Sequence, residues 1–298
     1  MSKPLVSILM NCYNGEKYLD EALSSVINQT YKNWELVFWD NLSSDKSKKI
    51  VNNIKDLRIK YFLSDIHTSQ YKARNKGLEK CSGEFIAFLD VDDYWLPTKL
   101  EEQIKLFRNT EIGFSCTNSW KINERIKGKN KLGFKKIYSG DVLEHLLKKD
   151  FIVMSSLVIR KSILKNLSIN FNPKYEIVGD LDFVLRLSTI TKLAGIQAPL
   201  VFYRLHENNL TYKKINLNYQ ELKILYNDIR YQNIYNQNKN FDFFKNNIIL
   251  YGAIYKILNK KRIESLNDLK MLTKTIHIIK FLIAFFLPNK ILLNWKKY

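Results

Sequence analysis

The sequence predicts an α/β protein with a doubly wound, mostly parallel β-sheet and a helical C-terminal extension. Three observations lead to this fold class. Short apolar runs alternate with amphipathic helical patterns in the N-terminal part of the chain, as in sheets covered by helices on both faces. The run Phe85–Leu89 has no polar alternation, which is typical of a strand buried on both faces. From about Glu207 onward the pattern is helical.

The elements before Phe85 alternate strand with helix. Leu5–Met10 is a predicted strand that ends at the turn-forming segment Asn11–Gly15, and Tyr18–Ile27 carries its apolar residues on one helical face. The pattern then repeats as a strand at Glu35–Trp39, a helix around Ile50–Ile54, a strand at Ile59–Leu63 and a helix over Tyr71–Lys80.

Three carboxylates, Asp90, Asp92 and Asp93, follow the buried strand directly, and Pro97 then opens a helical pattern. In open α/β sheets, ligands bind outside the carboxyl ends of the strands. Crowded carboxylates need a compensating cation, and Mg²⁺ or Mn²⁺ bridging to substrate phosphates suits their oxygens. A solvated acidic turn is the alternative for an isolated motif of this kind, but its position after a buried strand favours a metal and phosphate site.

No glycine-rich phosphate loop of the Gly-x-x-x-x-Gly-Lys or Gly-x-Gly-x-x-Gly type occurs. We therefore expect metal and basic side chains to hold any nucleotide phosphates. A nucleotidyltransferase of similar sheet topology remains an alternative function, although such an enzyme should carry a glycine-rich basic loop where this chain has Asn11–Gly15.

Beyond Pro97 the pattern is less regular. Lys121–Lys136 is polar and basic, which indicates a loop or hairpin, and Pro199 interrupts the apolar run Leu193–Tyr203. The other predicted elements are strands at Ile112–Thr117 and Ser156–Ile159, a capped helix over Ser139–Lys149 and a helix that starts near Val178.

The 298 residues include 48 basic and 29 acidic side chains, a net charge of +19. Such a charge attracts polyanions, namely nucleic acid, anionic lipid or phosphorylated substrates. A nucleic-acid-binding module is the least favoured function, because no helix-turn-helix, zinc or RNP pattern occurs. The three cysteines, Cys12, Cys81 and Cys116, are too widely spaced for a zinc site or a disulfide framework, so we expect buried thiols in a reducing cytoplasm.

Five segments occur in an order that resembles the N-terminal half of family 2 glycosyltransferases: Pro4–Asn14, Ala22–Tyr31, Trp39–Asp45, Ala73–Gly77 and Gly83–Pro97. Gly179–Leu187 and Tyr203–His206 are similar to motifs of the acceptor half of that family. The resemblance covers about Pro4–Thr211. It implies an inverting enzyme of GT-A fold that moves a sugar from a nucleotide-diphosphate donor to a glycan or lipid-linked acceptor, in surface polysaccharide biosynthesis.

The resemblance also implies domain limits and site residues. Residues 1–206 form the expected GT-A domain, with a nucleotide-sugar half (1–97) and an acceptor half (98–206), and residues 207–298 form a basic helical extension. The expected metal ligands are Asp92, Asp90 and His206, and Asp180 matches the catalytic base. The expected nucleotide-binding residues are Asn11, Tyr13, Asp40, Asn41, Asp90 and Arg74, of which Asn11, Asp40 and Asn41 match positions lining the base pocket.

One position departs from the family, which commonly has two aspartates where this chain has Asp40 and Asn41. A carboxylate can only accept a hydrogen bond, whereas an amide can accept or donate. The identity of the nucleotide base therefore stays open.

Several site residues have structural alternatives. Asp180 can serve as a helix N-cap, His206 can be a structural histidine, and Arg74 can belong to a solvated helix face. Asp182 and Arg186, four residues apart on a helix, indicate a surface ion pair.

The C-terminal extension is strongly basic, with 16 Lys and Arg against 6 Asp and Glu from Glu207 onward. It contains the apolar run Ile276–Pro288, followed by Lys290, Leu292, Leu293, Trp295, Lys296 and Lys297. No signal-peptide pattern or membrane-spanning run is found. We expect a cytoplasmic protein that attaches peripherally to an anionic membrane surface through this run, with a helix docked on the protein itself as the alternative.

Overall fold

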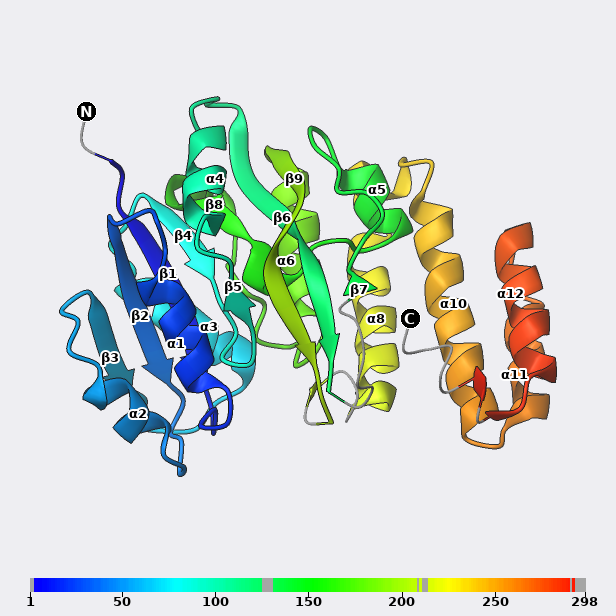
Figure 1. Cartoon of the computed structure of the whole chain (residues 1–298). Helices are drawn as coiled ribbons and strands as arrows, with labels where there is room; N and C mark the ends of the chain where they lie inside the picture. Colours follow the sequence, from blue (N-terminus) through cyan, green and yellow to red (C-terminus); the bar gives the residue numbers. More distant parts are fainter. Residues whose placement is uncertain (1–2, 125–130, 208, 211–213, 290, 293–298) are drawn as a thin grey trace. The chain divides into compact units, whose positions relative to one another are not determined.

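The computed structural model describes residues 3–124, 131–207, 209–210, 214–289 and 291–292. The chain forms two compact units, which Figure 1 shows. The first contains the residues up to Val142 together with Phe151–Glu207, and the second contains Leu143–Asp150 together with the residues after Glu207. From the sequence, Leu143–Asp150 was expected to belong to the first unit.

The first unit is built on one mixed sheet, which has nine strands in the described part of the chain. Their order is β3-β2-β1-β4-β8-β6-β9-β5, with β7 paired to β6. The strands are β1 (Val6–Cys12), β2 (Trp34–Asp40), β3 (Ile59–Leu63), β4 (Phe85–Phe88), β5 (Tyr94–Trp95), β6 (Ile112–Asn123), β7 (Lys131–Leu132), β8 (Val158–Arg160) and β9 (Lys192–Leu205). The strands β1 to β4 are parallel, so the predicted doubly wound, mostly parallel sheet is confirmed.

Helices cover both faces of this sheet because side chains alternate along each strand. Ile8 and Met10 of β1 share an apolar cluster with Leu23 of α1 and Val51 of α2. Leu9 points to the other face, where it meets Gly77 of α3. The helices of this unit are α1 (Leu19–Ile27), α2 (Ser47–Asn53), α3 (Gln70–Lys80), α4 (Lys99–Leu106) and α6 (Gly179–Ser188).

The strand directions bring distant segments to one edge of the sheet. Strand β8 is antiparallel to both β4 and β6, and β9 is parallel to β6. The strands β1, β2, β4 and β9 therefore end at the same edge. Four segments that lie far apart in the sequence meet there: Asn11–Tyr13, Asp40–Asn41, Asp90–Asp93 and Arg204–His206.

Strands β9 and β6 differ from the sequence expectation in extent. The predicted interruption at Pro199 is wrong, because β9 continues past it, and a shift in register opposite Asn118 accommodates the proline. Strand β6 is longer than the predicted Ile112–Thr117, and it pairs with β7 in the region predicted as a loop or hairpin. Residues 125–130 of that region lie outside the described residues.

The second unit is helical, as the sequence predicts. Its helices in the described part are α5 (Leu143–Lys148), α8 (Ile215–Ile229), α9 (Asn233–Asn236), α10 (Phe241–Leu258), α11 (Arg262–Leu269) and α12 (Thr275–Phe286). Ile249 and Ala253 of α10 pack against Phe281 of α12. Among the described residues, no helix is both long and apolar enough to cross a bilayer.

The three cysteines, Cys12, Cys81 and Cys116, are buried free thiols, as predicted. Burial raises the pKa of the Cys81 thiol to about 12, so this side chain is protonated at neutral pH. All three pack in the first unit.

Candidate active site

The acidic loop after β4 is held in place by Asp93. This carboxylate is 1% exposed and accepts hydrogen bonds from Ser155 Oγ at 2.6 Å and from the backbone N–H of Arg204 at 2.9 Å. Burial and the nearby carboxylates of Asp92 and Asp90 raise its pKa well above the usual range. Asp93 therefore acts as the internal support of the loop, while Asp90 and Asp92 are presented at its surface.

Arg74 lies between two of the carboxylates that the sequence singles out. It comes from α3 and is 2% exposed, so it is not on a solvated helix face. Its Nη2 lies 2.8 Å from Asp90 Oδ1, and its Nη1 lies 2.5 Å from Asp180 Oδ1. Lys76 of the same helix is instead exposed and pairs with Glu79 at 3.2 Å. The expected contact of Arg74 with diphosphate stays a prediction.

Asp180 is the second residue of α6, and Val178 occupies the N-cap position without a side-chain cap, so the N-cap alternative is wrong. Gly179 lets this helix start lie against α3, because a Cβ there would be 2.5 Å from the Tyr71 ring. The side chain of Asp180 is 35% exposed. Burial raises the pKa of its carboxyl, although the positive charge of Arg74 opposes this.

Asp182 and Arg186 form the predicted ion pair, but it is not a surface pair. Asp182 is 6% exposed, and Arg186 donates to its Oδ2 from Nε at 3.0 Å and from Nη2 at 2.7 Å. Arg186 also donates to the backbone oxygens of Ile169 and Asn170. The pair therefore fixes the segment before α6, and Asp182 points away from Asp180.

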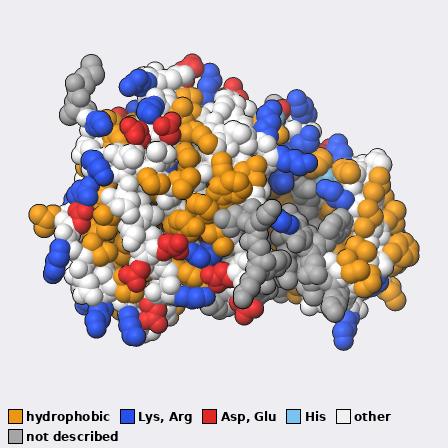
Figure 2. All heavy atoms as spheres, in the orientation of Figure 1, with side chains coloured by type: hydrophobic (Ala, Val, Ile, Leu, Met, Phe, Trp, Pro, Cys, Tyr) orange, Lys and Arg blue, Asp and Glu red, His pale blue; other side chains and the backbone are white. Residues whose placement is uncertain are grey.

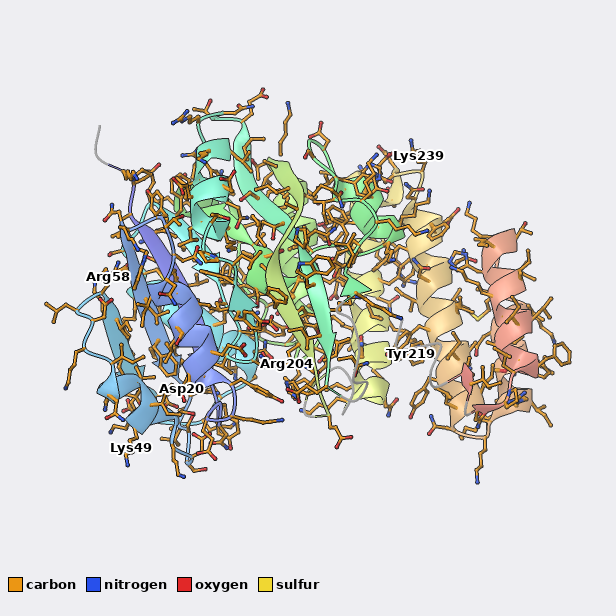
Figure 3. The ribbon with its side chains drawn as sticks, in the orientation of Figure 1. Asp20, Lys49, Arg58, Arg204, Tyr219 and Lys239 are labelled. Atoms are coloured by element: carbon orange, nitrogen blue, oxygen red, sulfur yellow. The ribbon has the colours of Figure 1, made fainter. Side chains whose placement is uncertain are left out.

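Asp92 and His206 meet across the edge of the sheet, with Asp92 Oδ2 2.9 Å from His206 Nε2. The end of β9 brings the histidine to the loop, since Arg204 Nε donates to the backbone oxygen of Asp92 at 2.9 Å. Figure 3 labels Arg204 at this end of the strand. No role was predicted for Arg204, although it lies in the Tyr203–His206 motif; the structure makes it a support of the acidic loop.

The residues present fit a divalent ion only with the help of a substrate. Among the described residues, no group of three or more His, Cys, Asp or Glu side chains could hold a metal ion. Asp92 Oδ2 and His206 Nε2 nevertheless lie close enough together to be ligands of the same ion. Mg²⁺ in nucleotide sites is usually held by one or two carboxylates plus substrate phosphates and water. The pair therefore fits an ion whose remaining ligands come from a diphosphate.

Asp40 and Asn41 are both buried, and their side chains form hydrogen bonds that fix neighbouring loops. Asp40 accepts hydrogen bonds from Tyr61 Oη at 2.6 Å and from the N–H of Ser43 at 2.7 Å. Asn41 Nδ2 donates to the backbone oxygen of Thr68 at 2.7 Å, and its Oδ1 accepts from the N–H of Thr68 at 3.1 Å. Contact of either side chain with a base stays a prediction.

The side chains of Asn11 and Tyr13 can contact a ligand. The amide atoms of Asn11 are buried, and among the described residues neither has a hydrogen-bond partner. The ring of Tyr13 is 52% exposed and lies 4.0 Å, centroid to centroid, from the ring of His67. His67, for which no role was predicted, also places Nδ1 3.0 Å from the backbone oxygen of Asn41. An orphaned amide beside an exposed aromatic ring suits a planar polar ligand such as a nucleobase.

The chain is similar in sequence to known glycosyltransferases. The family model described as glycosyl transferase family 2 matches residues 7–168. An uncharacterised glycosyltransferase of Haemophilus influenzae is 40% identical over 166 residues, which cover 55% of this chain and 65% of that protein. The Escherichia coli protein WfgD, named UDP-Glc:α-D-GlcNAc-diphosphoundecaprenol β-1,3-glucosyltransferase, is 35% identical over 228 residues, covering 75% of this chain and 84% of its own length.

Solved structures show the same fold. Residues 1–349 of Staphylococcus aureus TarS match with a TM-score of 0.67 and 18% identity, over 90% of this chain and 80% of that one. The same TarS fragment in complex with UDP-GlcNAc matches with a TM-score of 0.61 and 16% identity, over 88% of each chain.

Proposed function

Because the chain belongs to glycosyl transferase family 2 and has the GT-A fold, it is a glycosyltransferase, and we propose that it is metal-dependent, inverting and specific for a nucleotide-diphosphate sugar. The observation that carries this proposal is the meeting of Asp90, Asp92, Asp180 and His206 at the carboxyl edge of one sheet. Family membership excludes the nucleotidyltransferase alternative. We assign the donor to residues 1–97 and the acceptor to residues 98–206.

The donor side comprises the ends of β1, β2 and β4. Asn11 and Tyr13 would receive the base, and Asp90 would contact the ribose. Asp92 and His206, with Asp90, would hold Mg²⁺ or Mn²⁺. When bound, such an ion supplies positive charge to the departing nucleoside diphosphate, and electrostatic stabilisation of this kind usually contributes most to catalysis. TarS, which shares the fold, has been solved with UDP-GlcNAc, and WfgD is named for UDP-Glc, which supports a sugar nucleotide as donor.

On the acceptor side, Asp180 accepts the proton of a hydroxyl group as the oxygen of that group attacks the anomeric carbon. The bond from this carbon to the diphosphate breaks in the same step, so the anomeric configuration inverts. A carboxylate with a usual pKa of about 4 is a weak base. The burial that raises the pKa of Asp180 makes it a better one.

The acceptor we propose is a glycan intermediate, carried by a lipid as in the named substrate of WfgD, in polysaccharide biosynthesis at the inner face of the cell membrane. The test is incubation of the protein with a panel of sugar nucleotides and a lipid-linked diphosphate sugar, with release of nucleoside diphosphate as the readout. One donor should give release that depends on the acceptor. No acceptor-dependent release from any donor would refute the proposed function.

The solvent face of α12 supports attachment to a membrane surface. Its exposed side chains are large and apolar: Ile276, Ile279, Leu282, Ile283 and Phe286, of which Phe286 is 78% exposed. At 3.6 residues per turn these positions span an arc of about 120°. The opposite face, with His277, Phe281 and Ala284, is buried. Figure 2 shows apolar side chains gathered over the part of the molecule that Figure 1 labels α12.

We propose an anionic bilayer as the occupant of this face, because the residues after Glu207 carry 16 basic side chains and are strongly positive overall. The buried face of α12 packs on α10. The same helix can therefore dock on the protein with one face and contact a membrane with the other. Lys290, Trp295, Lys296 and Lys297, on which the sequence expectation also relied, lie outside the described residues.

A vesicle experiment tests this face. We expect the full chain to float with vesicles that contain phosphatidylglycerol. The double variant Ile279→Ser with Phe286→Ser should bind at least about tenfold more weakly, since burying one such side chain is worth about 1.5–3 kcal/mol. Leu57→Ser, at a fully exposed apolar position of the first unit, should bind like the wild type. Equal vesicle binding by the double variant and the wild type contradicts the proposal. So does sedimentation of the wild type as a dimer that the double variant does not form, because a second copy would then cover this face.

A further inference from the structure

The guanidinium of Arg74 joins the two halves of the site. It is 2% exposed, and its two terminal nitrogens contact different carboxylates, Asp90 in the loop after β4 and Asp180 at the start of α6. The two partners are 90 residues apart in the chain, so no local structure brings them together. A planar guanidinium with donors in a fixed fork can bridge two carboxylates in this way, whereas a lysine ammonium is a point charge.

The surroundings of Asp180 leave Arg74 as its main electrostatic partner. On α3, Tyr71 Oη accepts a hydrogen bond from the backbone N–H of Asp180 at 3.2 Å and donates to the backbone oxygen of Ile177 at 2.9 Å. Asp90 faces Asp180 only across the guanidinium and carries the same charge. Removal of Arg74 would therefore leave two carboxylates without a compensating charge beside a buried phenol.

We propose that Arg74 is a positioning residue that holds Asp180 ionised and oriented, and couples this acceptor-side base to the donor-side carboxylate Asp90. The inference rests on the proposed function, because it assigns Arg74 a role in the same reaction. Arg74 acts in this role through Asp180. Its charge sets the pH range in which the base is available, and its geometry sets where the base points.

The first test is the pH dependence of kcat/KM for the acceptor at saturating donor. Loss of the positive charge raises the pKa of Asp180. The acid limb of the pH profile, where activity falls because Asp180 becomes protonated, should therefore move to higher pH in Arg74→Met. The expected shift is about one unit or more, because the lost charge lies within hydrogen-bond distance. Arg74→Lys keeps the charge but cannot bridge both carboxylates. It should therefore keep an acid limb near that of the wild type while kcat falls.

Lys76→Met is the matched control, because Lys76 lies on the same helix, is exposed and pairs with Glu79 rather than with a carboxylate of the site. It should leave the acid limb and kcat unchanged. A purely structural role of Arg74 would lower the activity of Arg74→Met and Arg74→Lys alike without moving the limb. That result would overturn the proposal.

The second test needs no activity and remains decisive if Arg74→Met is too unstable to assay. The double variant Arg74→Met with Asp180→Asn removes one of the two uncompensated charges, so its Tm should exceed that of Arg74→Met by about 2 °C or more. Equal Tm values, or equal insolubility of the two proteins, would contradict the pairing. Absence of transfer by the wild type would instead refute the proposed function, and the Tm comparison would still report on Arg74.

Discussion

Replacement of Asp180 by asparagine is expected to abolish sugar transfer while donor binding stays near the wild-type level. Removal of a general base costs about 100- to 10,000-fold in turnover. Asp180 faces the acceptor side, and its contact with the donor side runs through Arg74, which still pairs with Asp90 in the variant. The measurements are kcat at saturating donor and the Kd of the sugar nucleotide by calorimetry.

Asp182→Asn is the matched control, two residues further along α6. Its carboxylate is buried and engaged by Arg186, so the variant should lose about 1–3 kcal/mol of unfolding free energy. Its kcat should stay near that of the wild type at a temperature where it is folded. Should Asp182→Asn abolish transfer in a folded protein and Asp180→Asn retain it, the assignment of the base would be wrong.

Removal of divalent ions is expected to have a similarly large effect. Transfer should stop in excess chelator and return with Mn²⁺ or Mg²⁺. Asp92→Asn should lose at least about a hundredfold in kcat, as the loss of one key electrostatic contact does. His206→Ala should lose less, because Asp92 and the diphosphate oxygens would remain as ligands.

Asp20→Asn serves as the control for charge alone, because Asp20 is an exposed carboxylate in the first turn of α1 (Figure 3). It should keep wild-type activity and metal dependence. Undiminished transfer in chelator, together with an active Asp92→Asn variant, would remove the metal from the mechanism and leave the Asp92–His206 contact a structural one.

Hydrophobic periodicity was enough to predict the first four strands. The strands β1, β2 and β4 carry apolar residues that are buried where helices cover the sheet, and β3 carries Ile59, Tyr61, Phe62 and Leu63. Periodicity failed at Pro199, where β9 continues because it bulges against β6 opposite Asn118. Such an adjustment depends on a partner far away in the sequence, which local pattern cannot report. The helical character of the second unit was predicted, but the attachment of α5 to it was not, since this depends on contacts such as Asn240 Nδ2 with the backbone oxygen of Glu144.

The proposed site residues Asp90, Asp92, Asp180 and His206 could all be named from motifs in the sequence, of which two follow strands and one starts α6. Their mutual contacts could not. The burial of Arg74 was hidden because an arginine in a polar helix pattern is usually exposed, and only the fold brings two carboxylates to it. The burial of the pair formed by Asp182 and Arg186 was missed for the same reason.

The anomeric configuration of the product tests the central claim most directly. With the donor identified, the transferred sugar can be examined by NMR through the coupling constant of its anomeric proton. A single displacement assisted by Asp180 predicts that an α-linked sugar nucleotide gives a β-linked product. Retention of the α configuration would contradict the account, because it would require a second displacement or a front-face attack in which Asp180 is not the base.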